Sequence, residues 1–208
     1  MSPLPLRMRD RWADRSEPEP GRGTIYWHML MQSYPGAREA VANAQAVLSE
    51  FPGFHMTPPE WLHMTTLVAG SAEEISRDQM SQMLSVAQEA LARMSPIPVT
   101  LSKILYHPEA VMLAARPVSA LTPVLAAAQE ATLKVTGHAG VVNESQTWTP
   151  HVTVSYSTAA QAAGPIIAAL GNAIPEHTVL IDSLTLVIQW GAERLWNWEA
   201  VGTVALGS

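Results

Sequence analysis

The sequence predicts an α+β fold in which most strands pair antiparallel. Three observations predict it. Segments with strand and helix patterns alternate along the chain. Short links join pairs of strand segments, and such links favour antiparallel neighbours because a parallel crossover needs many more residues. A His-x-Thr tripeptide lies on two of the strand segments, with the histidines at positions 63 and 151, which suggests two similar halves.

The first half is expected to contain two strands and two helices. In order, these are strand 23–31, helix 35–50, strand 61–70 and a helix that ends at Met94. Pro35 stands in the first turn of the first helix, where proline is well tolerated. Ser71 and Glu74 have the spacing of a capping box, which predicts that the second helix begins there.

The second half is expected to repeat the alternation. Its elements are strands 97–107 and 110–117, helix 118–135, a polar loop at 142–148, strand 151–157, a short helix ending at Gly171, and strands 178–189 and 195–205. The turn at 107–109 makes the first two strands a hairpin. Gly137 ends the long helix, because glycine readily adopts the left-handed conformation at that position.

Composition predicts an intracellular protein with a well-buried core. The chain has 208 residues, of which 48% are hydrophobic and 14% are charged. It contains no cysteine, which excludes disulfides, thiolate zinc sites and cysteine nucleophiles. No apolar run approaches the ~20 residues that span a bilayer, and the first residues lack the apolar core of a secretory signal. We therefore expect a cytoplasmic protein with no membrane partner.

The distribution of charge limits the kind of partner. The formal net charge is −6, and residues 1–23 hold five arginines against four acidic residues, so the remainder carries −7. Long nucleic acid requires a basic stripe, and this acidic body has only two lysines, Lys103 and Lys134. A small molecule or an RNA end is the expected partner, and long duplex nucleic acid is not. Residues 1–22, rich in proline and charge, are expected to form a flexible tail before a single domain over 23–208.

Two of the three His-x-Thr tripeptides stand on strands in the same phase. Side chains alternate faces along a strand, so His63 and Thr65 share one face while Met64 faces the core. In the same way, His151 and Thr153 lie opposite Val152, Val154 and Tyr156. The third copy, which starts at His55, runs into Pro58-Pro59, and proline disfavours an interior strand. We expect His55 to lie in a loop without a catalytic role.

An imidazole and a hydroxyl at each of two places could act on one phosphate. One neutral and one protonated histidine satisfy the requirement for a general base and a general acid near neutral pH. Threonine hydroxyls can donate to the non-bridging oxygens. The sequence has no HExxH pattern and no clustered carboxylates, so neither a metal nor another cofactor is expected.

The segments "PPEWLHMTTLVAG" and "TPHVTVSYS" resemble the paired motifs of the 2H phosphoesterase superfamily, in particular its bacterial 2′-5′ RNA ligase and cyclic phosphodiesterase branch. The resemblance covers the order of elements from about residue 23 onwards. It implies a bilobal fold of two pseudo-symmetric halves with a central groove that carries both motifs. It also implies cleavage of 2′,3′-cyclic or 2′-5′ phosphodiesters of a nucleotide or RNA end.

The resemblance assigns roles to four positions, and at a fifth this chain departs from the family. His63 and His151 would be the catalytic pair, and Thr65 and Thr153 would hold the phosphate. Many members of the RNA-processing branch place Arg or Lys a few residues past the second histidine, where this chain has Tyr156. A tyrosine hydroxyl can bind phosphate without adding charge, so Tyr156 is expected to contact the substrate.

Other functions remain open at this point. A module with the same fold could bind a nucleotide or RNA end without turning it over. In either case a monomer is expected. A metal site built from His55, His63 and His151 lacks carboxylate partners. Trp61 and Trp148 flank the motifs and could wall the groove or belong to the core. The remaining histidines are interpreted as ordinary polar residues; they are His28, His107, His138 and His177.

Overall fold

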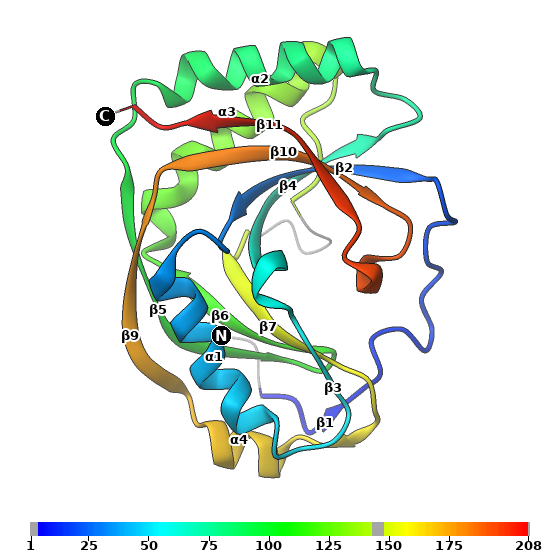
Figure 1. Cartoon of the computed structure of the whole chain (residues 1–208), viewed down its shortest axis with the longest axis vertical. Helices are drawn as coiled ribbons and strands as arrows, with labels where there is room; N and C mark the ends of the chain where they lie inside the picture. The colour runs from blue at the N-terminus through cyan, green and yellow to red at the C-terminus, as the bar shows by residue number, and fades with distance from the viewer. Residues whose placement is uncertain (1–3, 143–147, 208) are drawn as a thin grey trace.

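A computed structural model describes residues 4–142 and 148–207, and it contains two main antiparallel sheets (Figure 1). The four-stranded sheet has the order β11 (Trp198–Ala205), β10 (Ser183–Trp190), β2 (Gly23–Leu30), β4 (His63–Ser71). The five-stranded sheet has the order β3 (Phe54–Met56), β7 (His151–Ser157), β6 (Ala110–Arg116), β5 (Ile97–His107), β9 (Ala173–Ile181). A further short pair joins β1 (Arg7–Met8) to β8 (Gln161–Ala162). The α+β class with antiparallel sheets is confirmed.

Each main sheet carries its own pair of helices (Figure 1). The helices are α1 (Pro35–Leu48), α2 (Arg77–Leu91), α3 (Val118–Thr136) and α4 (Gly164–Leu170), and two short 3₁₀ turns are η1 (Pro59–Trp61) and η2 (Glu193–Leu195). Helices α2 and α3 pack on the four-stranded sheet, while α1 packs on the five-stranded sheet and contacts α4. Each lobe contributes one motif strand, β4 or β7, and these two strands contact each other.

The two lobes are not two successive halves of the chain. Strand β2 belongs to the four-stranded sheet, but the helix that follows it packs on the other sheet. Strands β10 and β11, at the end of the sequence, return to the first sheet. The chain therefore passes between the lobes repeatedly.

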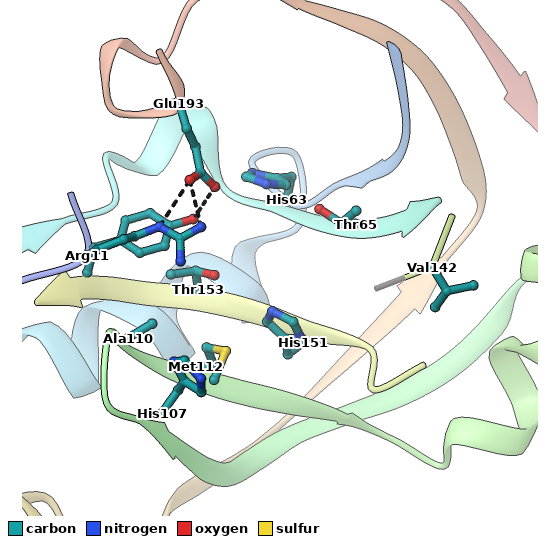
Figure 2. A pocket seen from close by; sticks show the side chains of 11 residues that line it. Arg11, His63, Thr65, His107, Ala110, Met112, Val142, His151, Thr153 and Glu193 are labelled. Atoms are coloured by element: carbon teal, nitrogen blue, oxygen red, sulfur yellow. Dashed lines mark hydrogen bonds and ion pairs between the residues drawn. The ribbon is translucent and has the colours of Figure 1, made fainter. Parts of the chain in front are cut away.

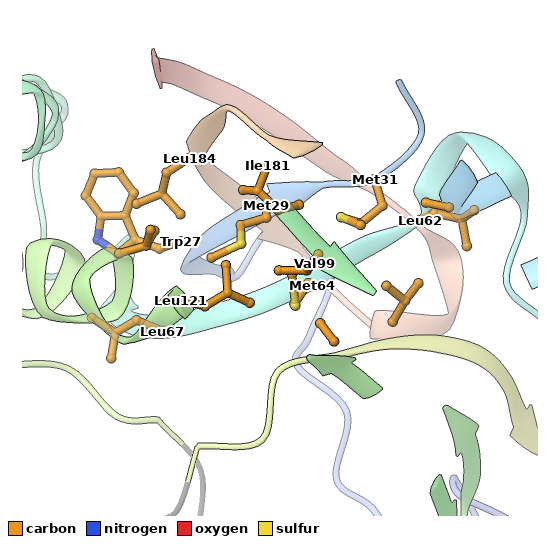
Figure 3. Packing of buried hydrophobic residues seen from close by; sticks show 14 of the residues in the cluster. Trp27, Met29, Met31, Leu62, Met64, Leu67, Val99, Leu121, Ile181 and Leu184 are labelled. Carbon is orange, nitrogen blue, oxygen red and sulfur yellow. The ribbon is translucent and has the colours of Figure 1, made fainter. Parts of the chain in front are cut away.

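The core of the first lobe lies on one face of β2 and β4 (Figure 3). Alternate residues of β2, Trp27 and Met29, are fully buried, as are Leu62 and Met64 around the start of β4. The one polar atom of the Trp27 ring, Nε1–H, donates to Thr132 Oγ1 on α3 at 3.1 Å. This bond satisfies the indole inside an apolar layer and attaches the helix to the sheet.

Both motif strands contain a β-bulge directly after the motif threonine. On β4, Thr65 pairs with His28 and Leu67 with Trp27, so Thr66 is an extra residue. On β7, Thr153 pairs with Met112 and Ser155 with Val111, so Val154 is an extra residue. A bulge of this kind shifts the alternation of side chains by one position.

Two boundaries differ from the sequence prediction. Helix α2 begins at Arg77 and not after Ser71, because β4 continues to Ser71, which pairs with Thr24. The capping box is formed by Ser76 and Gln79. The single strand expected at 178–189 is divided at Asp182 into β9 and β10, which belong to different sheets. Most of the polar loop expected at 142–148 lies outside the described residues.

The N-terminal segment packs on the body, contrary to the expectation of a flexible tail. Met8 is fully buried in the core, and β1 pairs with β8. The backbone N–H of Arg11 donates to the Ser157 carbonyl at the end of β7 at 2.9 Å. Met8 and the partly buried Trp12 supply the apolar contacts of this segment, whereas Leu4 and Leu6 are exposed. No helix among the described residues is long and apolar enough to cross a membrane.

Candidate functional site

A cavity of about 230 Å³ lies between the two motif strands. All five residues singled out in the sequence line it: His63, Thr65, His151, Thr153 and Tyr156. Figure 2 shows His63 and Thr65 on β4 at one side of the cavity and His151 and Thr153 on β7 at the other. The remaining lining residues are Arg11, His107, Ala110, Met112, Val142 and Glu193.

The two motif histidines are oriented by matching hydrogen bonds. His63 Nδ1 lies 2.8 Å from the Trp61 carbonyl oxygen, and His151 Nδ1 lies 2.7 Å from the Thr149 carbonyl oxygen. A carbonyl only accepts, so Nδ1–H is the donor in both rings. Each neutral imidazole therefore keeps the lone pair of Nε2 free for proton transfer.

His63 is the more enclosed of the two rings. Trp198 meets it edge-on at a ring-centroid distance of 4.7 Å, and His28 lies against it at 4.4 Å. Burial lowers the pKa of His63 below its usual value, although the Trp61 carbonyl and the charge of Glu193 act in the opposite direction. The ring is therefore favoured in its neutral form.

His151 has a lowered pKa for partly different reasons. Burial is the largest cause, and the Thr149 carbonyl opposes it. The positive charge of Arg11 and the neighbouring His107 lower the pKa further. One member of the Arg11–Glu193 ion pair thus shifts the pKa of each motif histidine. Glu193 raises that of His63, and Arg11 lowers that of His151.

The bulge on β7 explains why Tyr156 lines the cavity. Simple alternation places Tyr156 on the face opposite His151 and Thr153. The extra residue, Val154, reverses the phase after Thr153, so that Tyr156 joins the cavity side. The same effect on β4 buries Leu67 and leaves Val68 half-buried, although the sequence alternation assigned Val68 to the core face. The side-chain phase inferred from the sequence holds only up to the bulges.

A compact polar cluster closes one end of the cavity. Arg11 donates from Nε and a terminal nitrogen to Glu193 Oε2 at 3.1 and 2.7 Å, and the Tyr156 hydroxyl donates to Oε1 of the same carboxylate at 3.0 Å (Figure 2). The guanidinium lies over the Tyr156 ring, 4.5 Å from its centroid. Burial is the main reason that the pKa of Tyr156 is raised, so its hydroxyl keeps its proton.

His55 does not lie in the expected loop. Its backbone forms the short edge strand β3, paired with β7, and the two prolines follow the strand without interrupting it. Its Nε2 accepts a hydrogen bond from Trp196 Nε1 at 3.2 Å, and the imidazole is not among the described residues that line the cavity. A proline pair therefore terminates a strand here, as it can at a sheet edge.

Of the two alternatives for Trp61 and Trp148, packing against hydrophobic side chains is the one seen, whereas two histidines depart from their first interpretation. Neither Trp61 nor Trp148 is among the described lining residues; Trp148 Nε1 donates to the Thr65 carbonyl at 3.1 Å and so supports the first motif from the second half of the chain. His107, interpreted as an ordinary turn residue, lines the cavity. His28 is buried against His63, and its Nδ1 has no hydrogen-bond partner among the described residues.

Sequence reasoning missed the cationic side of the site. Arg11 was assigned to a flexible tail, although Met8 and Trp12 on either side of it are apolar residues that could have signalled packing. Glu193 lies between unremarkable neighbours, and no local pattern identifies it. Among the residues that the structure describes, no group of three or more His, Cys, Asp or Glu side chains is placed to hold a metal ion.

The chain was compared with known families and structures. The family model of the 2′-5′ RNA ligase superfamily matches residues 34–193. Among solved structures, TT0787 of Thermus thermophilus has 16% identity and a TM-score of 0.63, over 89% of this chain and 99% of that one. E. coli LigT complexed with 3′-AMP has 16% identity and a TM-score of 0.60, over 93% and 100% of the two chains. The MHV ns2 PDE domain has 15% identity and a TM-score of 0.54, over 91% and 100%. These structural similarities establish the fold. No curated protein matches the sequence.

Proposed function

Because this chain belongs to the 2′-5′ RNA ligase superfamily, we propose that it is a phosphodiesterase that opens a 2′,3′-cyclic phosphate or cleaves a 2′-5′ phosphodiester of a nucleotide or RNA end. The observation that carries the proposal is the pair of histidines on one cavity. Both are fixed through Nδ1 by a backbone carbonyl, and both have a threonine two residues further along the strand.

The reaction needs two proton transfers on opposite sides of phosphorus. The neutral imidazole accepts a proton from water at Nε2, and the water oxygen forms a bond to phosphorus. The protonated imidazole gives the proton on its Nε2 to the ester oxygen, whose bond to phosphorus breaks. Protons and charge balance, and the next cycle begins after the two rings exchange protons with solvent. His63 and His151 are the residues proposed for these steps.

The threonines and Tyr156 are proposed to hold the substrate. Thr65 and Thr153 can donate from their hydroxyls to the two non-bridging oxygens, where negative charge must be stabilised. The ring of Tyr156 forms part of the cavity wall. Its hydroxyl donates to Glu193, so its contact with substrate is proposed through the ring. A small nucleotide suits a cavity of about 230 Å³, and the LigT structures with 3′-AMP and ATP support this class of ligand. The expectation of a cytoplasmic monomer is part of the same proposal.

Single-site variants test the catalytic pair. His63→Ala and His151→Ala should each lower kcat/KM on a 2′,3′-cyclic nucleotide by about 10²- to 10⁴-fold. The double variant should lose little more than the worse single variant, because the two groups act as a unit. His55→Ala is the matched control and should keep nearly full turnover. Equal loss in His55→Ala, with folding intact, would mean that the wrong histidine was chosen.

A chelator tests the metal-independent part of the proposal. The proton transfers require only imidazoles, so turnover should persist in excess EDTA. Loss of activity that zinc or magnesium restores would contradict this part. Binding of the nucleotide without any turnover would support the alternative, a binding module on the same fold.

A further inference from the structure

We propose that Arg11, carried by the N-terminal segment, binds the anionic phosphate of the substrate, and that Glu193 competes with this phosphate for the guanidinium. The inference rests on the proposed function for the identity of the ligand as a phosphoester. It adds a binding residue from a segment that lies outside the residues matched by the family model, 34–193.

Arg11 is the only arginine or lysine among the described residues that line the cavity. Its side chain is 16% exposed, far less than the 65% of Arg9 or the 48% of Arg15 in the same segment. Burial acts to lower the pKa of Arg11, but the carboxylates of Glu193 and Glu109 and the nearby Tyr156 raise it, so the group stays charged. An enclosed permanent cation beside two histidines is suited to a ligand that carries negative charge.

The position of Arg11 is fixed by its backbone as well as by its side chain. The N–H of Arg11 donates to Ser157 at the end of β7, and the N–H of Arg9 donates to the Pro108 carbonyl at 2.7 Å. Further along the segment, Glu17 accepts from Arg194 at 2.7 Å. The segment is therefore attached both to the motif strand β7 and to the turn η2, with the guanidinium held between them.

Glu193 occupies the donors that a phosphate would use. Its Oε2 accepts from two nitrogens of Arg11, and its Oε1 accepts from Tyr156. A guanidinium presents the same planar set of donors to a carboxylate and to a phosphate. The Glu193 side chain is 43% exposed and stands on a short 3₁₀ turn, so it can turn into solvent, while Arg11 keeps its contact with Glu109 at 3.5 Å. Exchange of one anion for another keeps Arg11 paired throughout.

The two residues should affect phosphate affinity with opposite signs. The probe is inorganic phosphate, with its Kd measured by calorimetry at pH 7.5. Arg11→Gln removes the charge and should raise Kd about tenfold or more. Glu193→Gln keeps the size and an acceptor for Arg11 but removes the competing charge, and it should lower Kd by about two- to fivefold. Arg11→Lys keeps the charge but loses the planar set of donors, and its Kd should lie between those of the parent protein and Arg11→Gln.

Arg7→Gln is the matched control. Arg7 belongs to the same segment, is exposed and does not line the cavity, whereas Arg15 pairs with Glu109, which also lies 3.5 Å from Arg11. The substitution of Arg7 should leave the phosphate Kd unchanged. Thermal melting of every variant checks that the fold is retained. If Arg11→Gln is unfolded, the phosphate Kd of Arg11→Lys tests the inference in its place.

The outcomes separate this inference from the proposed function. An unchanged phosphate Kd in Arg11→Gln, in a protein that hydrolyses cyclic nucleotide, would overturn the inference and leave the function intact. An equal loss in Arg7→Gln would overturn it as well, because the packing of the segment and not the Arg11 donors would then be responsible. Weaker binding in Glu193→Gln would overturn the competition and make Glu193 a positioning residue. Phosphate binding that depends on Arg11, without any hydrolysis, would support the inference while the proposed function fails.

Discussion

Two backbone carbonyls, those of Trp61 and Thr149, decide which nitrogen of each cavity histidine is available for chemistry. Each carbonyl lies two residues before its histidine, so a local turn of the chain fixes the tautomer without any other side chain. The same local geometry occurs in both lobes. Proton transfer through Nε2 in both rings follows from it.

The pH dependence of turnover should be displaced towards acid. Burial lowers the pKa of both His63 and His151, and catalysis needs one ring neutral and the other protonated. The plot of log kcat/KM against pH should be bell-shaped, with its maximum below the ordinary histidine pKa of about 6.5. The limbs belong to the pair and not to single residues. A maximum well above pH 7 would contradict the direction of these pKa shifts.

The threonines of the motifs should matter less than the histidines. Thr65→Val or Thr153→Val keeps the side-chain shape and removes one donor to phosphate, so kcat/KM should fall by about 10- to 100-fold, which is less than for either histidine variant. Steady-state kinetics on a 2′,3′-cyclic nucleotide measures this. Activity equal to that of the parent protein in both variants would remove the threonines from the proposed mechanism.

The bulges are the features of strands β4 and β7 that most affect the site. Each follows its motif threonine directly, at Thr66 and Val154, and each reverses the phase of the residues after it. Val154 at its bulge is apolar and fully buried. Thr66 is equally buried, but its hydroxyl has no hydrogen-bond partner among the described residues.

Thr66→Val should therefore stabilise the protein, by about 1 kcal/mol, because it removes a buried unsatisfied hydroxyl and keeps the shape. Thr132→Val is the matched control at a site that is also fully buried. The Thr132 hydroxyl accepts from Trp27 and donates to the Ala128 carbonyl, so its loss should destabilise. Urea unfolding of both variants measures the two free energies. If both substitutions changed the free energy of unfolding in the same direction, burial of the hydroxyl and not its hydrogen bonding would determine the change.

The start of helix α2 offers a second comparison of equivalent substitutions. Ser76 accepts from the Gln79 backbone N–H, and the Gln79 side chain accepts from the Ser76 N–H. Ser76→Ala should cost about 1 kcal/mol of stability. Ser71→Ala, at the position that the sequence pattern favoured, should cost clearly less, because the Ser71 hydroxyl accepts from the Glu73 N–H in a turn and does not cap a helix. Equal costs in urea unfolding would contradict the assignment of the cap.

The sequence predicted strands and helices well where residues close in sequence determine them. The alternation around His63 and His151 put each imidazole on the same strand face as its threonine, and the structure brings the two faces to one cavity. The bulges, the division of the chain at Asp182 and the packing of Arg11 were not predicted. Each depends on a partner strand or loop that is distant in sequence, such as the pairing of Ile181 with Ile97 in one sheet and of Ser183 with Ala205 in the other.

On the scale of the whole molecule, buried histidines link stability to pH. The pKa of His28, His63 and His151 is lowered in the folded protein, in each case mainly by burial. Above about pH 6.5 these groups are neutral in both the folded and the unfolded chain. As pH falls below that value, the unfolded chain takes up protons that the folded chain does not, so stability is lost.

The free energy of unfolding should accordingly fall between pH 7.5 and pH 5.5. Urea denaturation at several pH values measures it, in a window above the range where most carboxylates titrate. His28→Leu removes one of the contributing groups and should reduce the slope, whatever its effect on stability at pH 7.5. A slope equal to that of the parent protein would show that His28 does not contribute.

The order in which the chain visits its two sheets has a mechanical consequence. Domains joined by one linker can swing apart about a hinge. Here the backbone crosses between the lobes after β2, β3, α2, β6, α3 and β9. Val68 of β4 is also bridged to Val141 by two hydrogen bonds. No single cut in a loop would release a lobe with its sheet complete. These repeated crossings, together with the direct contact of β4 with β7, therefore restrict a swing of one lobe against the other more than a single linker would.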